Sequence, residues 1–316
     1  MASRLSGTSR PLRPTGAPVV ALFGPTGLGK TEVALGLAER IGAEIVSADS
    51  MQVYAGLPVL TNQPTAEQLA RVPYHLIGLV PPTTEFSVAE YAGLAQAAID
   101  GTLARGKRVV LEGGSGLYLR AALGGLRFGS PPSAARAALE ARAAADLQGL
   151  VDELAGLDPA TAAAIDCDNP RRVVRALESV AAAGRPLAPR ERDALWAPGS
   201  RYEYRLYALE PDRERLRERL EARVDEMVSR GLIEEVAALP SRLSRTVRQA
   251  IGVRETLAYL AGELDLDEAT QRMKRRTRRY VRRQLTWMRK LPDADRILVA
   301  GRSPEHISRE IAKAAS

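Results

Sequence analysis

The chain has 316 residues, of which 45% are hydrophobic and 4% are aromatic, so it can form one large domain or a domain with an insertion. Its formal net charge of +7 favours a polyanionic partner such as nucleic acid, although an arginine-rich surface without a specific partner fits the same composition. The single cysteine, Cys167, excludes an internal disulfide and a zinc site built from cysteines.

The first 17 residues are rich in arginine and serine and contain no acidic residue. They superficially resemble a transit peptide, but they lack a helical apolar stripe and contain prolines. We therefore predict a disordered tail over residues 1–17. No apolar run approaches the roughly 20 residues that a membrane-spanning helix needs, so we expect a cytoplasmic enzyme with no membrane partner.

Three apolar segments alternate with helical patterns in the next part of the chain. Predicted strands lie at 18–24, 44–48 and 107–116, and each one leads into a short polar or glycine-rich motif. Strands that alternate with helices indicate a parallel sheet, in which ligands bind at the carboxyl ends of the strands. The fold class expected is therefore α/β.

Alanine-rich helical patterns without a predicted strand occupy residues 123–199, which we predict to be an all-helical insertion domain. A strand at 201–211 returns the chain to the sheet, and long charged helices are predicted at 212–239 and 267–290. The predicted core domain thus consists of residues 18–122 and 200–316.

The first motif, GPTGLGKT, fits the G-x-x-x-x-G-K-[ST] pattern of a phosphate-binding loop between a strand and a helix. Its glycines allow backbone N–H groups to point at phosphate oxygens, Lys30 adds a positive charge, and the Thr31 hydroxyl can bind Mg²⁺. The predicted phosphate or pyrophosphate site consists of Gly24, Pro25, Thr26, Gly27, Leu28, Gly29, Lys30 and Thr31. The fate of the phosphate stays open, because RVVLEGG offers Glu112 where a nucleotide hydrolase usually has an aspartate.

The second motif, VSADSMQVY, places Asp49 at the end of a predicted strand. Asp49 can be a helix cap, or it can be a catalytic carboxylate that accepts a proton from a nucleophile beside the phosphate site. The spacing alone does not decide between these roles.

The third motif is the segment 271–290, which contains ten lysines or arginines and no acidic residue. On a helix, Met273, Thr277, Tyr280, Gln284 and Trp287 form the stripe that docks on the protein. Arg272, Arg275, Arg276, Arg279, Arg282 and Arg283 form a cationic stripe beside it. Without acidic residues to balance them, these arginines favour binding to phosphates over a purely solvated face.

Taken together, residues 18–290 resemble the tRNA dimethylallyltransferases, also called tRNA isopentenyltransferases. The resemblance rests on seven stretches in this order: GPTGLGKT, VSADSMQVY, GGSGLYLRA, NPRRVVRALE, RVDEMVSRGLIEEV, QAIGVRE and TRRYVRRQLTWMRK. A phosphate-binding loop alone is common to many unrelated proteins, whereas the ordered set is specific to this family.

The resemblance implies a fold like that of the P-loop kinases and transfer of a dimethylallyl group from dimethylallyl diphosphate to N6 of adenosine 37, next to the anticodon. It implies that the loop grips the pyrophosphate, that Asp49 takes the N6 proton, and that Lys30 and Arg223 stabilise charge on the departing pyrophosphate. Thr31 is expected on Mg²⁺. We also expect a monomer.

The resemblance further implies binding of the tRNA anticodon stem-loop by a larger set of residues. These are Asp49, Ser50, Met51, Gln52, Ser115, Arg136, Arg171, Arg172, Val173, Val174, Arg175, Gln249, Ala250, Ile251, Gly252, Val253, Arg254, Arg279 and Arg283. The chain departs from the family pattern at three places. GLPVLTNQP at 56–64 lacks an acidic residue and a lysine that are usual there, HLIG at 75–78 has Gly78 where an aspartate is usual, and Ser115 replaces the usual threonine.

Three other functions remain open from the sequence. A P-loop small-molecule kinase would bind and turn over ATP, and an adenine-nucleotide isopentenyltransferase would not need the basic helix. A non-catalytic RNA-binding protein would not need an intact loop beside Asp49.

Overall fold

The computed structural model describes residues 18–126, 134–187, 199–291 and 294–315. The chain forms two compact units: residues up to Gly124 join those from Ser200 onward in the first unit, and Gly125–Gly199 make the second. The tail predicted over residues 1–17 lies outside the described residues.

The first unit is built on a parallel six-stranded sheet with the order β3-β2-β4-β1-β5-β6. Its strands are β1 (Val19–Phe23), β2 (Ala43–Ser47), β3 (Tyr74–His75), β4 (Arg108–Gly113), β5 (Tyr204–Glu210) and β6 (Asp295–Leu298). Every residue of β1 and β2 is buried, as expected for central strands with both faces covered. This arrangement confirms the predicted α/β fold with a P-loop kinase-like parallel sheet.

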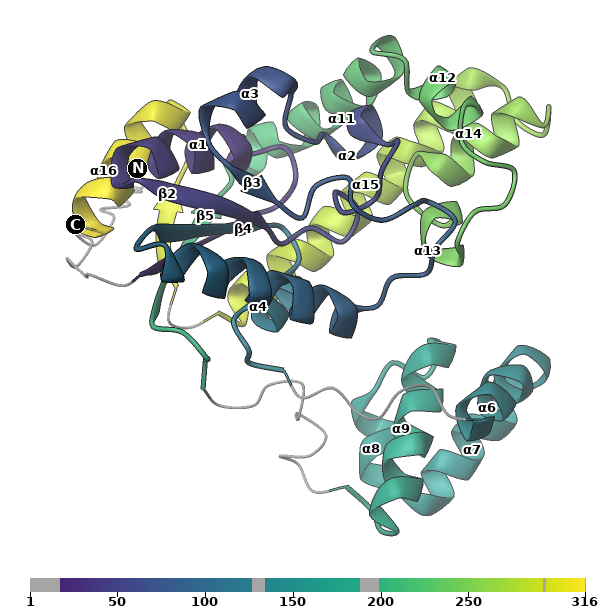
Figure 1. The fold of residues 1–316 in the computed structure, drawn as a ribbon. Coiled ribbons are helices and arrows are strands. Elements are labelled where there is room, and N and C mark those ends of the chain that lie inside the picture. The colour runs from purple at the N-terminus through teal and green to yellow at the C-terminus, as the bar shows by residue number, and fades with distance from the viewer. Residues whose placement is uncertain (1–17, 127–133, 188–198, 292–293, 316) are drawn as a thin grey trace, which may run out of the picture. The chain divides into compact units, whose positions relative to one another are not determined.

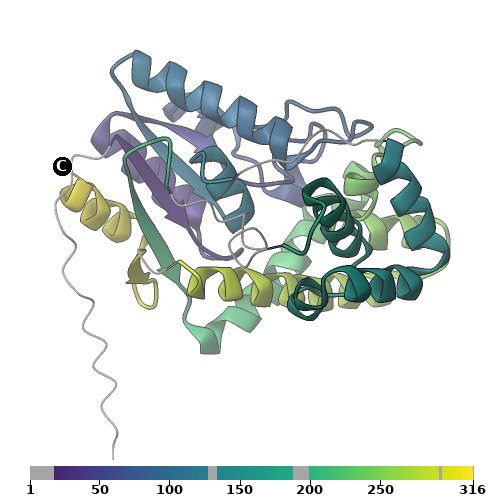
Figure 2. The same cartoon turned by 90° about the horizontal axis from the view of Figure 1, so that it is seen from below.

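Helices cover both faces of the sheet (Figures 1 and 2). One face carries α1 (Lys30–Ile41), α3 (Ala66–Arg71) and α16 (Pro304–Ala315), and the other carries α4 (Val88–Ala104) and α5 (Gly116–Ala122). The large core between α1, α16 and the sheet includes apolar side chains such as Leu22, Leu37 and Ile311. Packing of these helices against the sheet fixes the ends of the strands, where the predicted motifs lie.

A second apolar core of this unit lies beyond the carboxyl ends of the strands. It is formed by α2 (Pro58–Thr61), α11 (Arg213–Ser229), α12 (Leu232–Ala237), α13 (Arg245–Arg248), α14 (Val253–Leu260) and α15 (Leu266–Arg289). The long helix α15 packs against α5, α11 and α14, so it joins the sheet region to this second core (Figure 1).

Two features of the fold differ from the sequence-based expectation. The helix predicted over 212–239 is interrupted at Gly231, whose φ of 94° is a left-handed conformation that favours glycine and ends α11 before α12 begins. The strands β3 and β6 were not predicted. Among the described residues, no helix is both long and apolar enough to cross a bilayer.

The second unit contains α6 (Ala134–Ala145), α7 (Leu147–Leu157), α8 (Pro159–Ala164) and α9 (Pro170–Ala183). Its described residues form no strand, in agreement with the all-helical prediction. The unit has its own apolar core, which includes Leu150, Leu154, Val174 and Leu177.

Candidate active site

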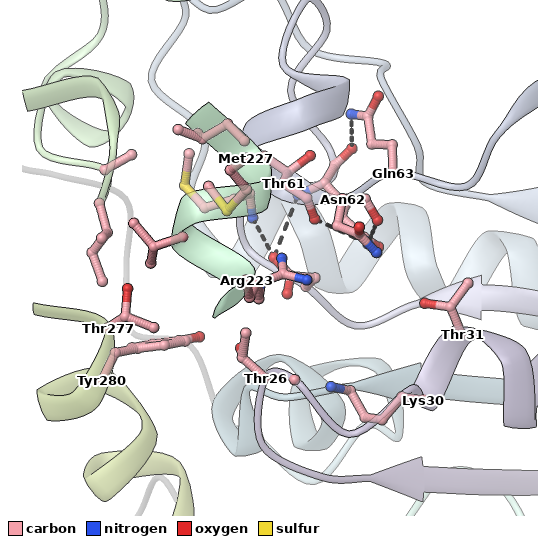
Figure 3. Close-up of a pocket in the computed structure, with 18 of the residues that line it drawn as sticks. Thr26, Lys30, Thr31, Thr61, Asn62, Gln63, Arg223, Met227, Thr277 and Tyr280 are labelled. Atoms are coloured by element: carbon pink, nitrogen blue, oxygen red, sulfur yellow. Dashed lines mark hydrogen bonds between the residues drawn. The ribbon is translucent and has the colours of Figure 1, made fainter. Parts of the chain in front are cut away.

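A cavity of about 800 Å³ lies in the first unit at the carboxyl ends of β1, β2 and β4. Its walls come from the phosphate-binding loop, the segment after β2, the end of α2, and the helices α11 and α15. In Figure 3, Lys30, Arg223 and Tyr280 extend into the same space from three different elements. Motifs that are distant in the sequence therefore share one cavity.

The loop from Gly24 to Thr31 has the shape of a phosphate cradle. Gly27 and Gly29 have φ values of 87° and 71°, which allow the turn before α1. Thr26, Gly27, Gly29, Lys30 and Thr31 line the cavity. The others support the loop: Gly24 donates its N–H to Gly113 O at 3.3 Å, Pro25 accepts from Lys30 Nζ at 3.1 Å, and Leu28 is buried in the core.

Lys30 and Arg223 are two of the cations that line this cavity. Burial lowers the pKa of Lys30, against the opposing effect of the nearby Glu112 and Asp49 carboxylates. Burial also lowers the pKa of Arg223 on α11, but a guanidinium stays charged in a protein. In the part of the chain that the structure describes, Arg223 forms no ion pair within 4.0 Å. These two cations can therefore bind a highly charged anion such as pyrophosphate.

Asp49 lies two residues after the end of β2, and its carboxylate lines the same cavity. Its Oδ1 accepts the backbone N–H of Met51 at 2.8 Å and that of Gln52 at 3.4 Å. The two roles that the sequence left open are thus compatible, because one oxygen caps the turn while the side chain still borders the cavity. Ser50, Met51 and Gln52 line the cavity as well.

The atypical segment 56–64 is held beside Asp49 by polar contacts. Gln52 Oε1 accepts from Ser47 Oγ at 2.8 Å, and Gln52 Nε2 donates to Asn62 O at 3.0 Å. Gln63 Nε2 donates to the carbonyls of Gln52 and Tyr54, both at 2.8 Å. The segment is therefore an ordered wall of the cavity.

One residue that sequence reasoning did not place in the site is Gln284 of α15. Its Oε1 accepts the Thr26 N–H at 3.0 Å, and its Nε2 donates to Gly114 O at 2.8 Å. A Cβ on Gly114 would lie 2.3 Å from Gln284 Nε2, so only glycine allows this approach. The sequence analysis placed Gln284 on the docking stripe of the helix, but periodicity could not reveal that it bridges the phosphate-binding loop and the loop after β4.

Tyr280 of α15 was also assigned only to the docking stripe. Its side chain lines the cavity, and the Arg283 guanidinium lies 5.9 Å from the centre of its ring. Burial raises the pKa of Tyr280, and the negative charge of Asp49 acts in the same direction. The hydroxyl is therefore neutral and available as a hydrogen-bond donor.

The cationic stripe predicted on α15 is only partly free, which corrects the sequence-based interpretation. Arg272 and Arg275 pair with Glu268, and Arg276 pairs with the buried Glu255 at 2.5 Å. Within the described residues, Arg279, Arg282 and Arg283 form no ion pair. The acidic partners lie outside the segment 271–290, so its own composition could not show them.

The stretch QAIGVR splits between the cavity and its surroundings. Gln249, Ala250 and Ile251 line the cavity. Gly252 has a φ of 102° and packs so closely that a Cβ would lie 2.4 Å from Leu60 Cδ1, while Val253 is buried. Arg254 and Arg279 line a separate cleft between α14 and α15.

The remaining predicted tRNA-binding residues are not among those that line the cavity. Ser115 occupies the N-terminal end of α5. In the second unit, Arg136 pairs with Glu140 at 3.3 Å, and Val173 and Val174 are buried in the core. The side chains of that stretch that reach solvent belong to Arg171, Arg172 and Arg175.

Comparisons with known proteins give a consistent result. The family model described as IPP transferase matches residues 52–291. The tRNA dimethylallyltransferase of Anaeromyxobacter dehalogenans (strain 2CP-C) is 47% identical over 278 residues, which cover 86% of this chain and 92% of that protein. The tRNA dimethylallyltransferase of Geobacillus thermodenitrificans (strain NG80-2) is 41% identical over 280 residues, covering 86% and 87%.

Solved structures show the same similarity. The full-length tRNA isopentenylpyrophosphate transferase from Bacillus halodurans has a TM-score of 0.67 at 36% identity, covering 93% of this chain and 94% of that one. A eukaryotic dimethylallyltransferase acting on tRNA has a TM-score of 0.72 at 26% identity, covering 89% of this chain and 73% of that one.

Proposed function

The chain belongs to the IPP transferase family, and from this we propose that it is a tRNA dimethylallyltransferase. The reaction transfers a dimethylallyl group from dimethylallyl diphosphate to N6 of adenosine 37, next to the anticodon, and releases pyrophosphate. The observation that carries this proposal is the meeting of Lys30, Asp49 and Arg223 in one cavity, because it joins an anion clamp to a carboxylate.

The pyrophosphate of the donor binds the loop amides and Lys30 on one wall and Arg223 on the other. As the adenine N6 attacks the allylic carbon, the carbon–oxygen bond to pyrophosphate breaks and negative charge grows on the leaving group. Cations aimed at that charge in a partly buried site stabilise the transition state more than the ground state. Lys30 and Arg223 therefore act on the leaving group.

Asp49 accepts the proton that N6 loses as the new carbon–nitrogen bond forms. An exocyclic amine is a poor nucleophile until its proton can be transferred to a base, and a positioned carboxylate supplies that base. The two backbone N–H groups that bind Oδ1 hold the carboxylate in place. The target adenosine has to leave its stack to reach this position in the cavity, as in other enzymes that modify bases.

Mg²⁺ fits the site. The Thr31 hydroxyl lines the cavity, and its hydrogen bond to Glu112 Oε1 is long, at 3.5 Å, so the hydroxyl oxygen is open to an ion. Thr31 would hold the ion, which, when bound, supplies positive charge to the pyrophosphate oxygens.

The anticodon stem-loop binds the exposed arginines of α9 and the free arginines of α15, mainly through backbone phosphates. We propose that the enzyme acts as a monomer and in the cytoplasm, where its tRNA substrate is found.

A transfer assay tests the function directly. With Mg²⁺, dimethylallyl diphosphate and unmodified tRNA, we expect the mass of adenosine 37 to increase by one dimethylallyl group. Transfer to AMP but not to tRNA would indicate an adenine-nucleotide isopentenyltransferase, and consumption of ATP with a small-molecule acceptor would indicate a kinase. Either outcome rejects the proposal.

A further inference from the structure

Glu112 is a buried carboxylate that the mechanism above does not use. It lies in β4 with only 3% of its surface exposed, and it borders the cavity. Its Oε1 accepts hydrogen bonds from the hydroxyls of Tyr74 and Thr31, the second at 3.5 Å. Its Oε2 has no hydrogen-bond partner among the described residues. A buried carboxylate oxygen without a hydrogen-bond partner is unfavourable, so its presence at this position calls for an explanation.

The position of Glu112 in the sheet places it beside the phosphate-binding loop. Strand β4 is the neighbour of β1, and Glu112 is paired with Leu22, one residue before the end of β1. The phosphate-binding loop begins directly after β1, so Glu112 and Thr31 lie on the same side of the loop. In P-loop enzymes an acidic residue in such a position holds Mg²⁺ together with the loop hydroxyl.

We propose that Glu112 is the second protein contact for Mg²⁺ beside Thr31, with Oε2 directed at the ion or at one of its waters. Mg²⁺ prefers oxygen ligands and is usually bound by one or two carboxylates together with substrate phosphates. One carboxylate oxygen, one hydroxyl and the pyrophosphate of the donor provide this set. The inference rests on the proposed function, because the pyrophosphate belongs to the proposed donor.

Tyr74 of β3 acts as a positioning residue in this arrangement. Its hydroxyl donates to Oε1, which leaves Oε2 for the cation. Such outer contacts orient a carboxylate ligand and commonly change metal affinity by about 10- to 100-fold when removed.

A simpler role for Glu112 would be that of a counter-ion for Lys30. In the described part of the chain Lys30 forms no ion pair with Glu112 within 4.0 Å, and its ammonium donates instead to Pro25 O at 3.1 Å. Burial raises the pKa of Glu112, and the charge of Lys30 opposes this only in part. A divalent cation would compensate the buried charge more completely.

Calorimetry tests the inference without relying on turnover. Pyrophosphate is titrated into the protein in two buffers, one with Mg²⁺ and one with EDTA, and the two affinities are compared. For the wild type we expect Mg²⁺ to tighten pyrophosphate binding. For Glu112→Gln, which keeps the size and the acceptor for Tyr74, we expect this tightening to fall by about tenfold or more. Pyrophosphate affinity in EDTA should not fall. Tyr74→Phe should show a smaller loss in the same direction, and Glu226→Gln, in the wall of the same cavity, should retain the tightening.

Full Mg²⁺ tightening in Glu112→Gln, or none in the wild type, overturns the inference. If Glu112→Gln does not fold, Glu112→Asp carries the same test, because the shorter side chain retracts the carboxylate from the ion. Unchanged tightening in that variant overturns the inference as well. The prenyl-transfer assay on the wild type tests the proposed function, and the calorimetry tests the role of Glu112. The two claims can therefore fail independently.

Discussion

The Asp49 carboxylate has two oxygens in different surroundings. Oδ1 accepts two backbone N–H groups, whereas Oδ2 accepts no hydrogen bond within the described residues. This asymmetry suits a base whose orientation is fixed by one oxygen while the other receives a proton. The role of Asp49 can be tested with a variant that leaves the Oδ1 contacts unchanged.

We predict that Asp49→Asn retains tRNA binding and lowers the single-turnover rate about 10²-fold or more, because an amide cannot accept the N6 proton. The amide oxygen can still accept the N–H groups of Met51 and Gln52, so the local backbone is preserved. Quenched-flow transfer and filter binding measure the two quantities. An unchanged rate would remove Asp49 from the role of base.

Glu44, at the opposite end of β2, illustrates a carboxylate with a purely structural role. Burial alone would raise its pKa, but hydrogen bonds from His75, Arg105 and Thr102 outweigh burial and lower the pKa of Glu44 to about 2. It joins β2 to β3 and to the end of α4.

We predict that this carboxylate stabilises the fold above pH 4.5 and that its contribution is lost as the pH falls toward 2, because its folded pKa lies below its unfolded value of 4.5. A shift of this size corresponds to about 3 kcal/mol. Urea unfolding of wild type and Glu44→Gln should therefore differ most at pH 7 and converge in acid. Glu39→Gln, in an exposed pair with Arg71, serves as the control with a smaller effect. A pH-independent difference would contradict this account.

At the scale of elements, α15 combines two functions. Its buried face reaches the phosphate-binding loop through Gln284, and its other side presents Arg279 and Arg283. A helix is rigid over this distance, so the position of the loop and of the arginines that we propose to bind RNA depends on the same element.

We predict that Gln284→Met raises KM for dimethylallyl diphosphate by roughly 10- to 100-fold, because two hydrogen bonds are lost and the Thr26 N–H and Gly114 carbonyl keep no side-chain partner. The tRNA dissociation constant should change little, since the surface of α15 is untouched. Gln271→Met on the same helix is the matched control. If both variants have the wild-type KM, the bridge does not position the loop.

The free arginines of α15 allow a second test. Arg279→Ala with Arg283→Ala should weaken tRNA binding and reduce the slope of log K against log salt by about 2, one for each phosphate contact. Arg278→Ala is the control, because Arg278 is paired with Glu221 at 2.7 Å. Filter binding at several salt concentrations gives the slope, and a slope that does not move would show that this face only meets solvent.

The elements of the first unit were predictable where the pattern is local. The buried runs of β1, β2 and β4 and the loop between β1 and α1 follow from apolar runs and from the spacing of glycines. Strand β3 has only two residues and β6 has four, which is too short for an alternation to be recognised. The contact of Gln284 with Thr26 joins residues 258 positions apart, and no local pattern contains such information.

At the scale of the whole molecule, the chain divides its apolar residues among separate cores. The first unit holds the cavity and all residues that we assign to chemistry, whereas the second unit has its own core of residues such as Leu154 and Val174. The sequence predicted a change of character at this insertion because strand patterns stop there. Val173 and Val174 were assigned to tRNA binding together with the arginines around them, but they face the core of the second unit.

This division predicts that RNA affinity can be lowered without disturbing the chemical site. We expect Arg171→Ala, Arg172→Ala and Arg175→Ala in combination to reduce tRNA affinity at least about tenfold at physiological salt, because three exposed cations on one helix are lost. Pyrophosphate binding with Mg²⁺ should stay at the wild-type value, because its residues lie in the other unit.

The matched control for this triple variant is Arg142→Ala, because Arg142 belongs to the same unit but is engaged with Glu153 at 2.5 Å. It should bind tRNA as the wild type does. Filter binding measures the tRNA affinity and calorimetry the pyrophosphate affinity. Equal loss in the triple variant and in Arg142→Ala would mean that only the net charge of the unit matters, and a loss of pyrophosphate binding would mean that the two units do not act separately. The expected pattern, in which only the triple variant loses tRNA and neither loses pyrophosphate, assigns substrate capture to α9 and the chemistry to the strand ends.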